Sequence, residues 1–271
     1  MKTALSIWSC HKYIQNGTWT NADFIDFAKS IGAEGVELLS MFWKPDADIP
    51  AVEAALERTG LALACFGACN NLAVSDAAKR EEQVQDIVRS TDMAVRFGAP
   101  VVRVFAGDLH AGVDYEQAKA WIIEGLSRGA AYAEERGVTL CLENHGLLAG
   151  KIGQVRDIID SVGSPALRST FDMGNFLLVG EQPADAAEQL APLIGHVHVK
   201  DFKQTDEGGY KSLSGDRYIG TVPGEGDVGA AALLARFKAS GYEGWLSVEY
   251  EGSDEQRDGS ARAVRFVNEH R

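Results

Sequence analysis

A single local pattern recurs eight times along the chain: a short run of apolar and β-branched residues followed by a longer amphipathic stretch. Runs of this kind are typical of parallel strands that carry helices on one face and pack against a core on the other. A glycine or proline precedes several runs, as in GAEGVE and GAPVVR, where a helix is expected to close onto the next strand. The pattern predicts strands at residues 3–8, 34–39, 61–67, 101–107, 138–144, 167–172, 195–200 and 245–250.

The stretches between these runs have helical spacing. In the segment 76–99, apolar residues such as Val84 and Ile87 recur along one helical face. Ser75 is the expected N-cap of this helix and Gly98 its expected end. The segment 115–137 repeats the plan and ends at a glycine.

Eight strands that alternate with helices form either a closed barrel or an open doubly wound sheet. No GxGxxG or Walker A segment follows the first predicted strand, which disfavours the open nucleotide-binding sheets. The length of 271 residues suits one barrel. We therefore predict an α/β fold, a single-domain (β/α)8 TIM barrel over residues 1–271.

Charge and composition restrict the classes of molecule that the protein is expected to bind. The net charge of −13 disfavours nucleic acid, whose phosphates require a basic surface. The four cysteines form no CxxC pair, which suits a reducing cytoplasmic location. No apolar run approaches the roughly 18 residues of a membrane span, and the N-terminal run is too short for a signal peptide. We expect a cytoplasmic protein with no nucleic-acid or membrane partner.

Residue types that bind metals stand at the ends of four consecutive predicted strands. These ends read LCLENHG, STFDMGN, HVHVKD and LSVEYEG. Because alternate residues of a strand face the same way, four side chains should point into the barrel at one level. We call them the four candidate ligands: Glu143, Asp172, His198 and Glu249. His196 is expected deeper on the same face of its strand, and Lys200 at the mouth.

Three inward carboxylates and an imidazole would be poorly solvated without a cation. The sequence therefore predicts one bound divalent metal ion. Three oxygen ligands and one nitrogen suit Mn²⁺, Mg²⁺, Co²⁺ or Zn²⁺, and the lack of a thiolate argues against a structural zinc site.

The segment 201–227 interrupts the pattern, because it is long, polar and rich in glycine. It follows the seventh predicted strand on the face where barrels carry their active sites, and such long loops are usually functional. We expect it to be a flap over the substrate, with Tyr210, Lys211 and Arg217 as its candidate contacts.

Several motifs together resemble those of the xylose isomerase-like TIM barrels: GAEGVEL, LENH, DMGN, HVHVKD, VPGEGDVG and GYEGWLSVEYEG. That family includes sugar phosphate isomerases and epimerases, ketose 3-epimerases, hydroxypyruvate isomerase, inosose dehydratase, dehydroshikimate dehydratase and an AP endonuclease. The resemblance covers nearly the whole chain. It implies a metal held by the four candidate ligands, with the two glutamates also moving the proton.

The implied activity is that of a divalent-metal-dependent isomerase or epimerase. Its substrate would be a small sugar, sugar phosphate or ketoacid, converted through a metal-stabilised enediolate. Glu143 and Glu249 are the expected catalytic residues. Lys200, His145, Glu37 and Asn175 are the expected substrate-binding residues.

Two departures from the family pattern bear on this activity. The sugar epimerases often carry histidine where this chain has Asn175, and arginine where it has Gln204, which disfavours a strict free-ketose 3-epimerase. The extra histidines of the endonuclease are also lacking, since the fourth strand region reaches only His110.

Three alternatives concern activity and assembly. The same site could dehydrate an inosose- or dehydroshikimate-like substrate as a lyase. A sugar-binding barrel without turnover is a second alternative, although it would tolerate the loss of a ligand carboxylate. Barrels of this kind often dimerise, so a homodimer is a possible assembly.

Overall fold

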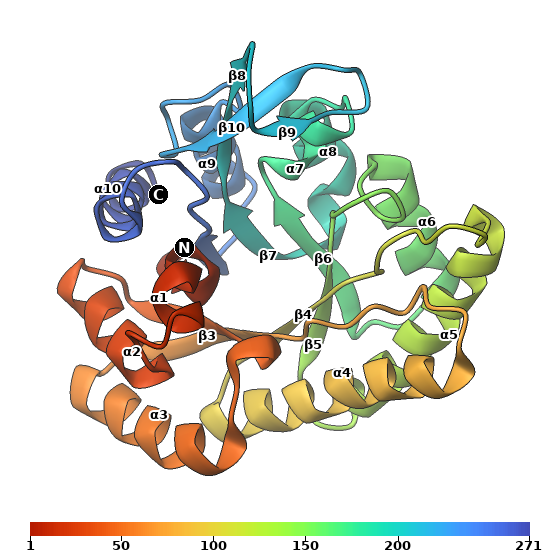
Figure 1. Ribbon diagram of the computed structural model, residues 1–271, viewed down its shortest axis with the longest axis horizontal. Coiled ribbons are helices and arrows are strands. Elements are labelled where there is room, and N and C mark those ends of the chain that lie inside the picture. Colours follow the sequence, from red (N-terminus) through yellow and green to blue (C-terminus); the bar gives the residue numbers. More distant parts are fainter.

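Eight parallel strands close into a barrel in the order β1-β11-β7-β6-β5-β4-β3-β2 (Figure 1). The structure is a computed structural model that describes residues 1–271. The closed barrel confirms the predicted (β/α)8 fold class, and the strands lie within a few residues of their predicted positions. Their bounds are β1 (Lys2–Ser6), β2 (Gly35–Leu39), β3 (Ala62–Gly67), β4 (Val101–Val104), β5 (Thr139–Glu143), β6 (Leu167–Asp172), β7 (Ile194–Val199) and β11 (Trp245–Val248).

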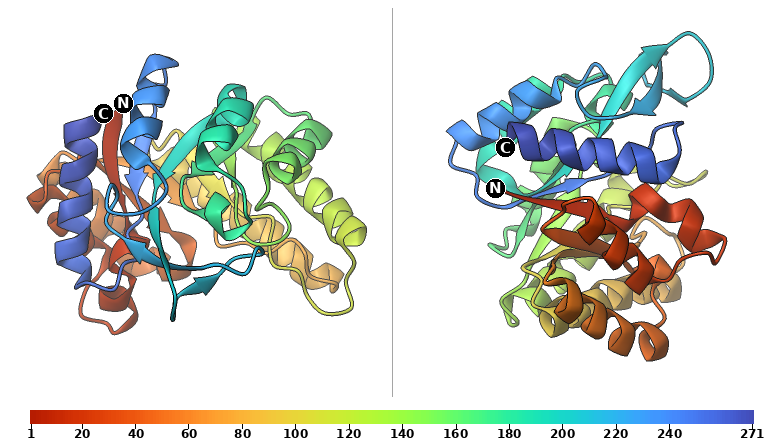
Figure 2. Two further views of the ribbon diagram at one scale, coloured as in Figure 1. Left: turned by 90° about the horizontal axis from the view of Figure 1, so that it is seen from above. Right: turned by 90° about the vertical axis from the view of Figure 1, so that its left-hand side faces the viewer.

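Helices surround the barrel, and the first and last strands lie side by side, so the two termini meet (Figure 2). No helix combines the length and the apolar character needed to cross a bilayer. The α-helices are α1 (His11–Gln15), α2 (Asn21–Ser30), α3 (Pro45–Thr59), α4 (Ala77–Phe97), α5 (Tyr115–Glu134), α6 (Ile152–Val162), α7 (Asn175–Leu178), α8 (Pro183–Leu190), α9 (Ala230–Ala239) and α10 (Gln256–His270). Three 3₁₀ turns add η1 (Ile7–Cys10), η2 (Ser40–Phe42) and η3 (Ala191–Leu193).

The ends of α4 show how local chemistry sets the helix bounds. The N-cap is Asp76 and not Ser75, because the Asp76 carboxylate accepts hydrogen bonds from the backbone N–H groups of Ala78 and Lys79. The predicted end is correct: Gly98 has a φ of 71°, a left-handed conformation that glycine adopts at little cost.

Strand alternation separates two buried environments. Leu140 and Leu142 of β5 belong to the large apolar core, whereas Cys141 between them packs in a small separate cluster with Cys65 and Val101. Successive side chains of a strand face opposite sides, so the large core lies towards the helices and the small cluster lies inside the barrel. The barrel interior is therefore thinly filled with apolar groups and leaves room for polar side chains above them.

The polar segment 201–227 was predicted as a loop, and this prediction is wrong for much of its length. It contains β8 (Asp201–Thr205), β9 (Tyr210–Lys211) and β10 (Arg217–Thr221), which form an antiparallel sheet in the order β8-β10-β9. We call this sheet the ribbon. It projects from the body of the barrel (Figure 2).

The base of the ribbon is held by one buried side chain. The Asp201 carboxylate accepts hydrogen bonds from the backbone N–H groups of Gly224, Gly226 and Val228 at 2.8–3.2 Å. A Cβ at Gly226 would lie 2.2 Å from Asp201 Oδ1, so only glycine fits there. The return of the chain from β10 towards α9 is thus fixed against the end of β7.

Candidate metal centre and adjoining cavity

Strand register brings the four candidate ligands to one level at the carboxyl ends of the barrel strands. Asp172 pairs with His198 across β6 and β7, and His198 pairs with Ser247 across β7 and β11. Glu143 ends β5, and Glu249 directly follows β11. The potential ligand atoms of these side chains all lie within 4.8 Å of one another.

One nitrogen stands at the centre of this group. His198 Nδ1 lies 3.8 Å from Glu143 Oε2, 3.7 Å from Asp172 Oδ2 and 3.7 Å from Glu249 Oε2. His198 Nδ1, Glu143 Oε2 and Asp172 Oδ2 are all buried and have no hydrogen-bond partner. Buried polar atoms are nearly always satisfied, so three such atoms facing one point fit a bound cation. The donor set of three oxygens and one nitrogen suits a divalent metal.

Two buried cations pair with the carboxylates. Lys200 Nζ lies 2.5 Å from Glu249 Oε2, 3.2 Å from Asp172 Oδ2 and 3.4 Å from Glu251 Oε1. Arg103 Nε lies 3.2 Å from Glu143 Oε2, and its guanidinium also donates to the Ala68 carbonyl at 2.7 Å. Neither cation is therefore free to neutralise a second anion.

These contacts shift the protonation of the site when it holds no cation. Burial raises the pKa of Glu249 to about 7, with Lys200 and His198 opposing that rise. Burial alone would lower the pKa of Lys200, but the neighbouring carboxylates hold it well above its ordinary value. Burial would likewise lower the pKa of His198, yet the surrounding carboxylates raise it well above the usual range. The metal-free cluster therefore retains protons that a cation must displace.

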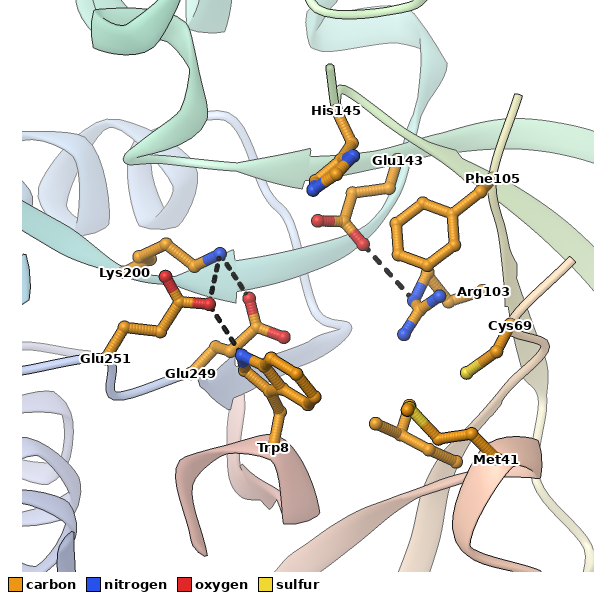
Figure 3. A pocket seen from close by; sticks show the side chains of 11 residues that line it. Trp8, Met41, Cys69, Arg103, Phe105, Glu143, His145, Lys200, Glu249 and Glu251 are labelled. Atoms are coloured by element: carbon orange, nitrogen blue, oxygen red, sulfur yellow. Dashed lines mark hydrogen bonds and ion pairs between the residues drawn. The ribbon is translucent and has the colours of Figure 1, made fainter. Parts of the chain in front are cut away.

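A cavity of about 200 Å³ opens above the four candidate ligands. Figure 3 shows Glu143 and Glu249 reaching it from different sides, with His145 and Phe105 near Glu143 and with Trp8 and Glu251 near Glu249. The lining residues are Trp8, Leu39, Met41, Cys69, Arg103, Phe105, Glu143, His145, Lys200, Glu249 and Glu251.

The predicted substrate-binding residues divide into two groups. Lys200 and His145 line the cavity, and the exposed His145 ring lies 5.0 Å from the Phe105 ring. Glu37 and Asn175 do not line it. Asn175 is buried and donates a hydrogen bond to Glu143 Oε1 at 3.2 Å, so it contacts a candidate ligand. Glu37 is fully buried beneath His198, which puts it out of reach of a molecule in the cavity.

Seven lining residues were not predicted as site residues from the sequence, and four of these are charged or aromatic: Trp8, Arg103, Phe105 and Glu251. A signal was present for three of them. Arg103 is a charged residue inside an apolar strand, and Phe105 stands two positions later, where alternation places it on the same side. Glu251 has the same relation to Glu249. Trp8 gave no comparable signal, because it reaches the site from a 3₁₀ turn and donates its Nε1–H to Glu251 Oε1 at 2.6 Å.

Comparison with known families agrees with this architecture. The family model described as xylose isomerase-like TIM barrel matches residues 25–270. The chain belongs to this family. The resemblance inferred from the motifs is thereby confirmed.

Proteins whose names indicate different activities resemble the chain. Inosose dehydratase of Clostridium beijerinckii is 25% identical over 267 residues, covering 86% of this chain and 87% of the relative. A crystal structure of a D-tagatose 3-epimerase-like protein superposes with a TM-score of 0.80 at 20% identity and covers 99% of this chain and 97% of its own. The probable 3-DHS dehydratase of Bacillus anthracis gives a TM-score of 0.78 at 19% identity, covering 99% of each chain. At such identities the two structures establish the fold alone.

Proposed function

We propose that this protein is a divalent-metal-dependent lyase that dehydrates a small, uncharged polyol ketone. The three buried atoms that face one point without a hydrogen bond carry the proposal, because they fit the cation on which such chemistry depends. A relative that covers 86% of this chain is named inosose dehydratase, which favours dehydration over the isomerisation or epimerisation expected first from the motifs.

The charge and size of the cavity support an uncharged substrate. Glu143, Glu249 and Glu251 line it, and both lining cations are already paired with carboxylates. A phosphate or carboxylate on the substrate would therefore meet repulsion with no free cation to offset it. A volume of about 200 Å³ is below the roughly 300–1,000 Å³ of pockets for drug-sized ligands, which suits a single sugar-sized ring.

In the proposed reaction, the four candidate ligands would hold the cation, which when bound supplies Lewis-acid activation of the substrate carbonyl. Glu143 would take the proton from the carbon beside the carbonyl. The bond from the next carbon to its hydroxyl would then break, and that oxygen would keep the electron pair. The Lys200–Glu249 pair, whose groups lie 2.5 Å apart, would supply the proton that lets the hydroxyl leave as water.

Epimerisation is a second candidate, favoured by the placement of the two glutamates. Glu143 and Glu249 contact His198 Nδ1 from different strands and reach the cavity from different sides (Figure 3). Removal of a proton by one and its return by the other to the opposite face would invert the carbon.

Product analysis separates these reactions. The protein would be incubated with inososes, free ketoses, sugar phosphates and hydroxypyruvate in the presence of Mn²⁺, Co²⁺ or Mg²⁺. Dehydration creates a conjugated ketone with new ultraviolet absorbance, whereas epimerisation creates a new sugar without it. Turnover of only phosphorylated or carboxylated substrates would contradict the uncharged class. Binding of a polyol with no turnover under any cation would indicate a sugar-binding barrel.

The proton-transfer step has its own test. Glu143→Gln keeps the shape of the side chain but removes the base, so turnover should fall by roughly 10²–10⁴-fold. Exchange of solvent deuterium into the carbon beside the carbonyl should fall in parallel. Near wild-type exchange in a metal-loaded Glu143→Gln protein would contradict the assignment of Glu143 as base.

A further inference from the structure

A second polar cluster lies directly beneath the candidate metal centre. Glu37 of β2 is 0% exposed, and so are His196 and His198 of β7. Glu37 Oε2 lies 3.0 Å from His196 Nε2, and both Glu37 oxygens lie 3.1 Å from His198 Nε2. Strands β2 and β7 are not neighbours, since β1 and β11 separate them in the barrel order. The three side chains therefore meet across the barrel interior.

The chemistry of these contacts decides which His198 nitrogen is available to a cation. A carboxylate only accepts hydrogen bonds, so the two Nε2 atoms that face Glu37 must each carry a hydrogen. With Nε2 protonated, the Nδ1 atom of a neutral His198 carries the lone pair, and Nδ1 is the atom that faces Glu143, Asp172 and Glu249.

We propose that Glu37 is a positioning residue for the metal centre: it fixes the tautomer and ring orientation of His198, and His196 holds the Glu37 carboxylate in place. This inference rests on the proposed metal site. A carboxylate that accepts a hydrogen bond from a metal-bound histidine commonly orients the histidine ring and raises the affinity of the site for its metal. Glu37 thereby has a different role from the substrate contact expected from the sequence.

The same three residues could instead hold a second cation. The observations favour the hydrogen-bonded arrangement. All three side chains are fully buried, so no water could complete the coordination sphere, and a cation there would require Nε2 of both histidines to lose its hydrogen. One cation per chain is therefore expected.

The central experiment compares Glu37→Gln with the wild-type protein. A glutamine amide has one accepting oxygen and one donating NH₂ group. It therefore cannot replace both carboxylate oxygens of Glu37 as acceptors of hydrogen bonds from the two histidines. Mn²⁺ affinity, measured by electron paramagnetic resonance of the free ion at fixed pH, should fall about 10–100-fold. Cys65→Ala is the matched control, because Cys65 is buried, pairs in register with Glu37 and makes no hydrogen bond to either histidine. Its affinity should stay within about twofold of wild type.

Three results would overturn the inference. In the first, Glu37→Gln binds Mn²⁺ as tightly as Cys65→Ala, and the two metal-free variants lose similar thermal stability. Glu37 would then have only a structural role. The second is two Mn²⁺ ions per wild-type chain. The third needs no variant, so it applies even if Glu37→Gln fails to fold. ¹⁵N nuclear magnetic resonance of the Zn²⁺-loaded wild type should show His198 protonated at Nε2 and bound to metal at Nδ1. A spectrum with His198 protonated at Nδ1 and bound to metal at Nε2 would exclude the proposal. Failure of the proposed dehydration is distinguishable, because it would appear as a wild-type protein that binds Mn²⁺ but forms no conjugated ketone.

Discussion

Arg103 and Lys200 form ion pairs with different carboxylates around the cavity. Arg103 pairs with Glu143 on one side, and Lys200 contacts Asp172, Glu249 and Glu251 on the other. Both pairs are buried, where an unpaired charge is costly. The two cationic residues thus compensate a dense group of acids in the absence of a metal, and a bound metal ion would make each of them partly redundant.

Arg103→Met tests this balance. Without metal, the variant leaves the buried Glu143 carboxylate without its counter-ion, and the free energy of unfolding should fall by about 3–5 kcal/mol. Saturating Mn²⁺ should restore part of the loss, because the bound ion takes over the compensation. Arg58→Met removes an exposed ion pair with Asp26 and should cost at most about 1 kcal/mol, with or without metal. Chemical denaturation measures both. Equal losses in the two variants would contradict the role given to Arg103.

Cation binding should release protons, and their number should depend on pH. At pH 6, Glu249 with its pKa of about 7 and His198 with its raised pKa are both protonated in the metal-free protein, so about two protons should leave per cation. By pH 8 Glu249 is largely ionised, so fewer protons should leave than at pH 6. Affinity therefore rises with pH across this window. Calorimetry in buffers of different ionisation enthalpy counts the protons, and a binding constant that is flat from pH 6 to 8 would be incompatible with this prediction.

At the level of elements, the ribbon contributes no lining residue to the cavity and contacts the cavity wall from outside the barrel. Of its three predicted contacts, only Tyr210 reaches a lining residue: its hydroxyl lies 3.3 Å from Glu251 Oε2. Arg217 instead donates to the Gly208 carbonyl within the ribbon at 2.8 Å, and Lys211 is exposed. The ribbon thus contacts the Lys200–Glu251 side of the site through the Tyr210 hydroxyl, and Gly220 of β10 forms a backbone bridge with Gly252 next to Glu251.

Tyr210→Phe should show whether this attachment matters for turnover. Loss of a hydrogen bond to a charged group corresponds to about 1.5–3 kcal/mol, so kcat/KM should fall at least about tenfold while Mn²⁺ affinity stays unchanged. Lys211→Ala, on the same strand, is the control and should leave both values near wild type. Equal kinetics for the two variants would show that the ribbon hydroxyl plays no part in turnover.

The sequence predicted the barrel strands and the four candidate ligands because both depend on local patterns: short apolar runs and residue types at the strand ends. The ribbon was missed because β8, β9 and β10 pair within a polar, glycine-rich segment that lacks apolar alternation. The contact of Glu37 with His196 was missed for another reason. It joins strands 159 positions apart in the chain, and only closure of the barrel brings them together.

On the scale of the whole molecule, the four candidate ligands connect strands β5, β6, β7 and β11, so a bound cation cross-links half of the barrel. A ligand that binds only the folded state stabilises it by about 2.7 kcal/mol at 100 times its dissociation constant. For a domain of this size, that should raise the unfolding temperature by about 5–10 °C. Scanning calorimetry with and without a chelator measures the shift. Asp172→Asn should reduce it, and an unchanged wild-type temperature would speak against a metal site.

The pairing of β1 with β11 also has a consequence for synthesis on the ribosome. Strands β5, β6 and β7 emerge first and carry three of the candidate ligands, but Glu249 follows β11, which must insert between β7 and β1. Chains are synthesised from the N-terminus, and a single domain generally folds as one unit. The nascent protein therefore exposes an incomplete set of candidate ligands until β11 is in place, and all four could hold a cation together only after that strand has been made.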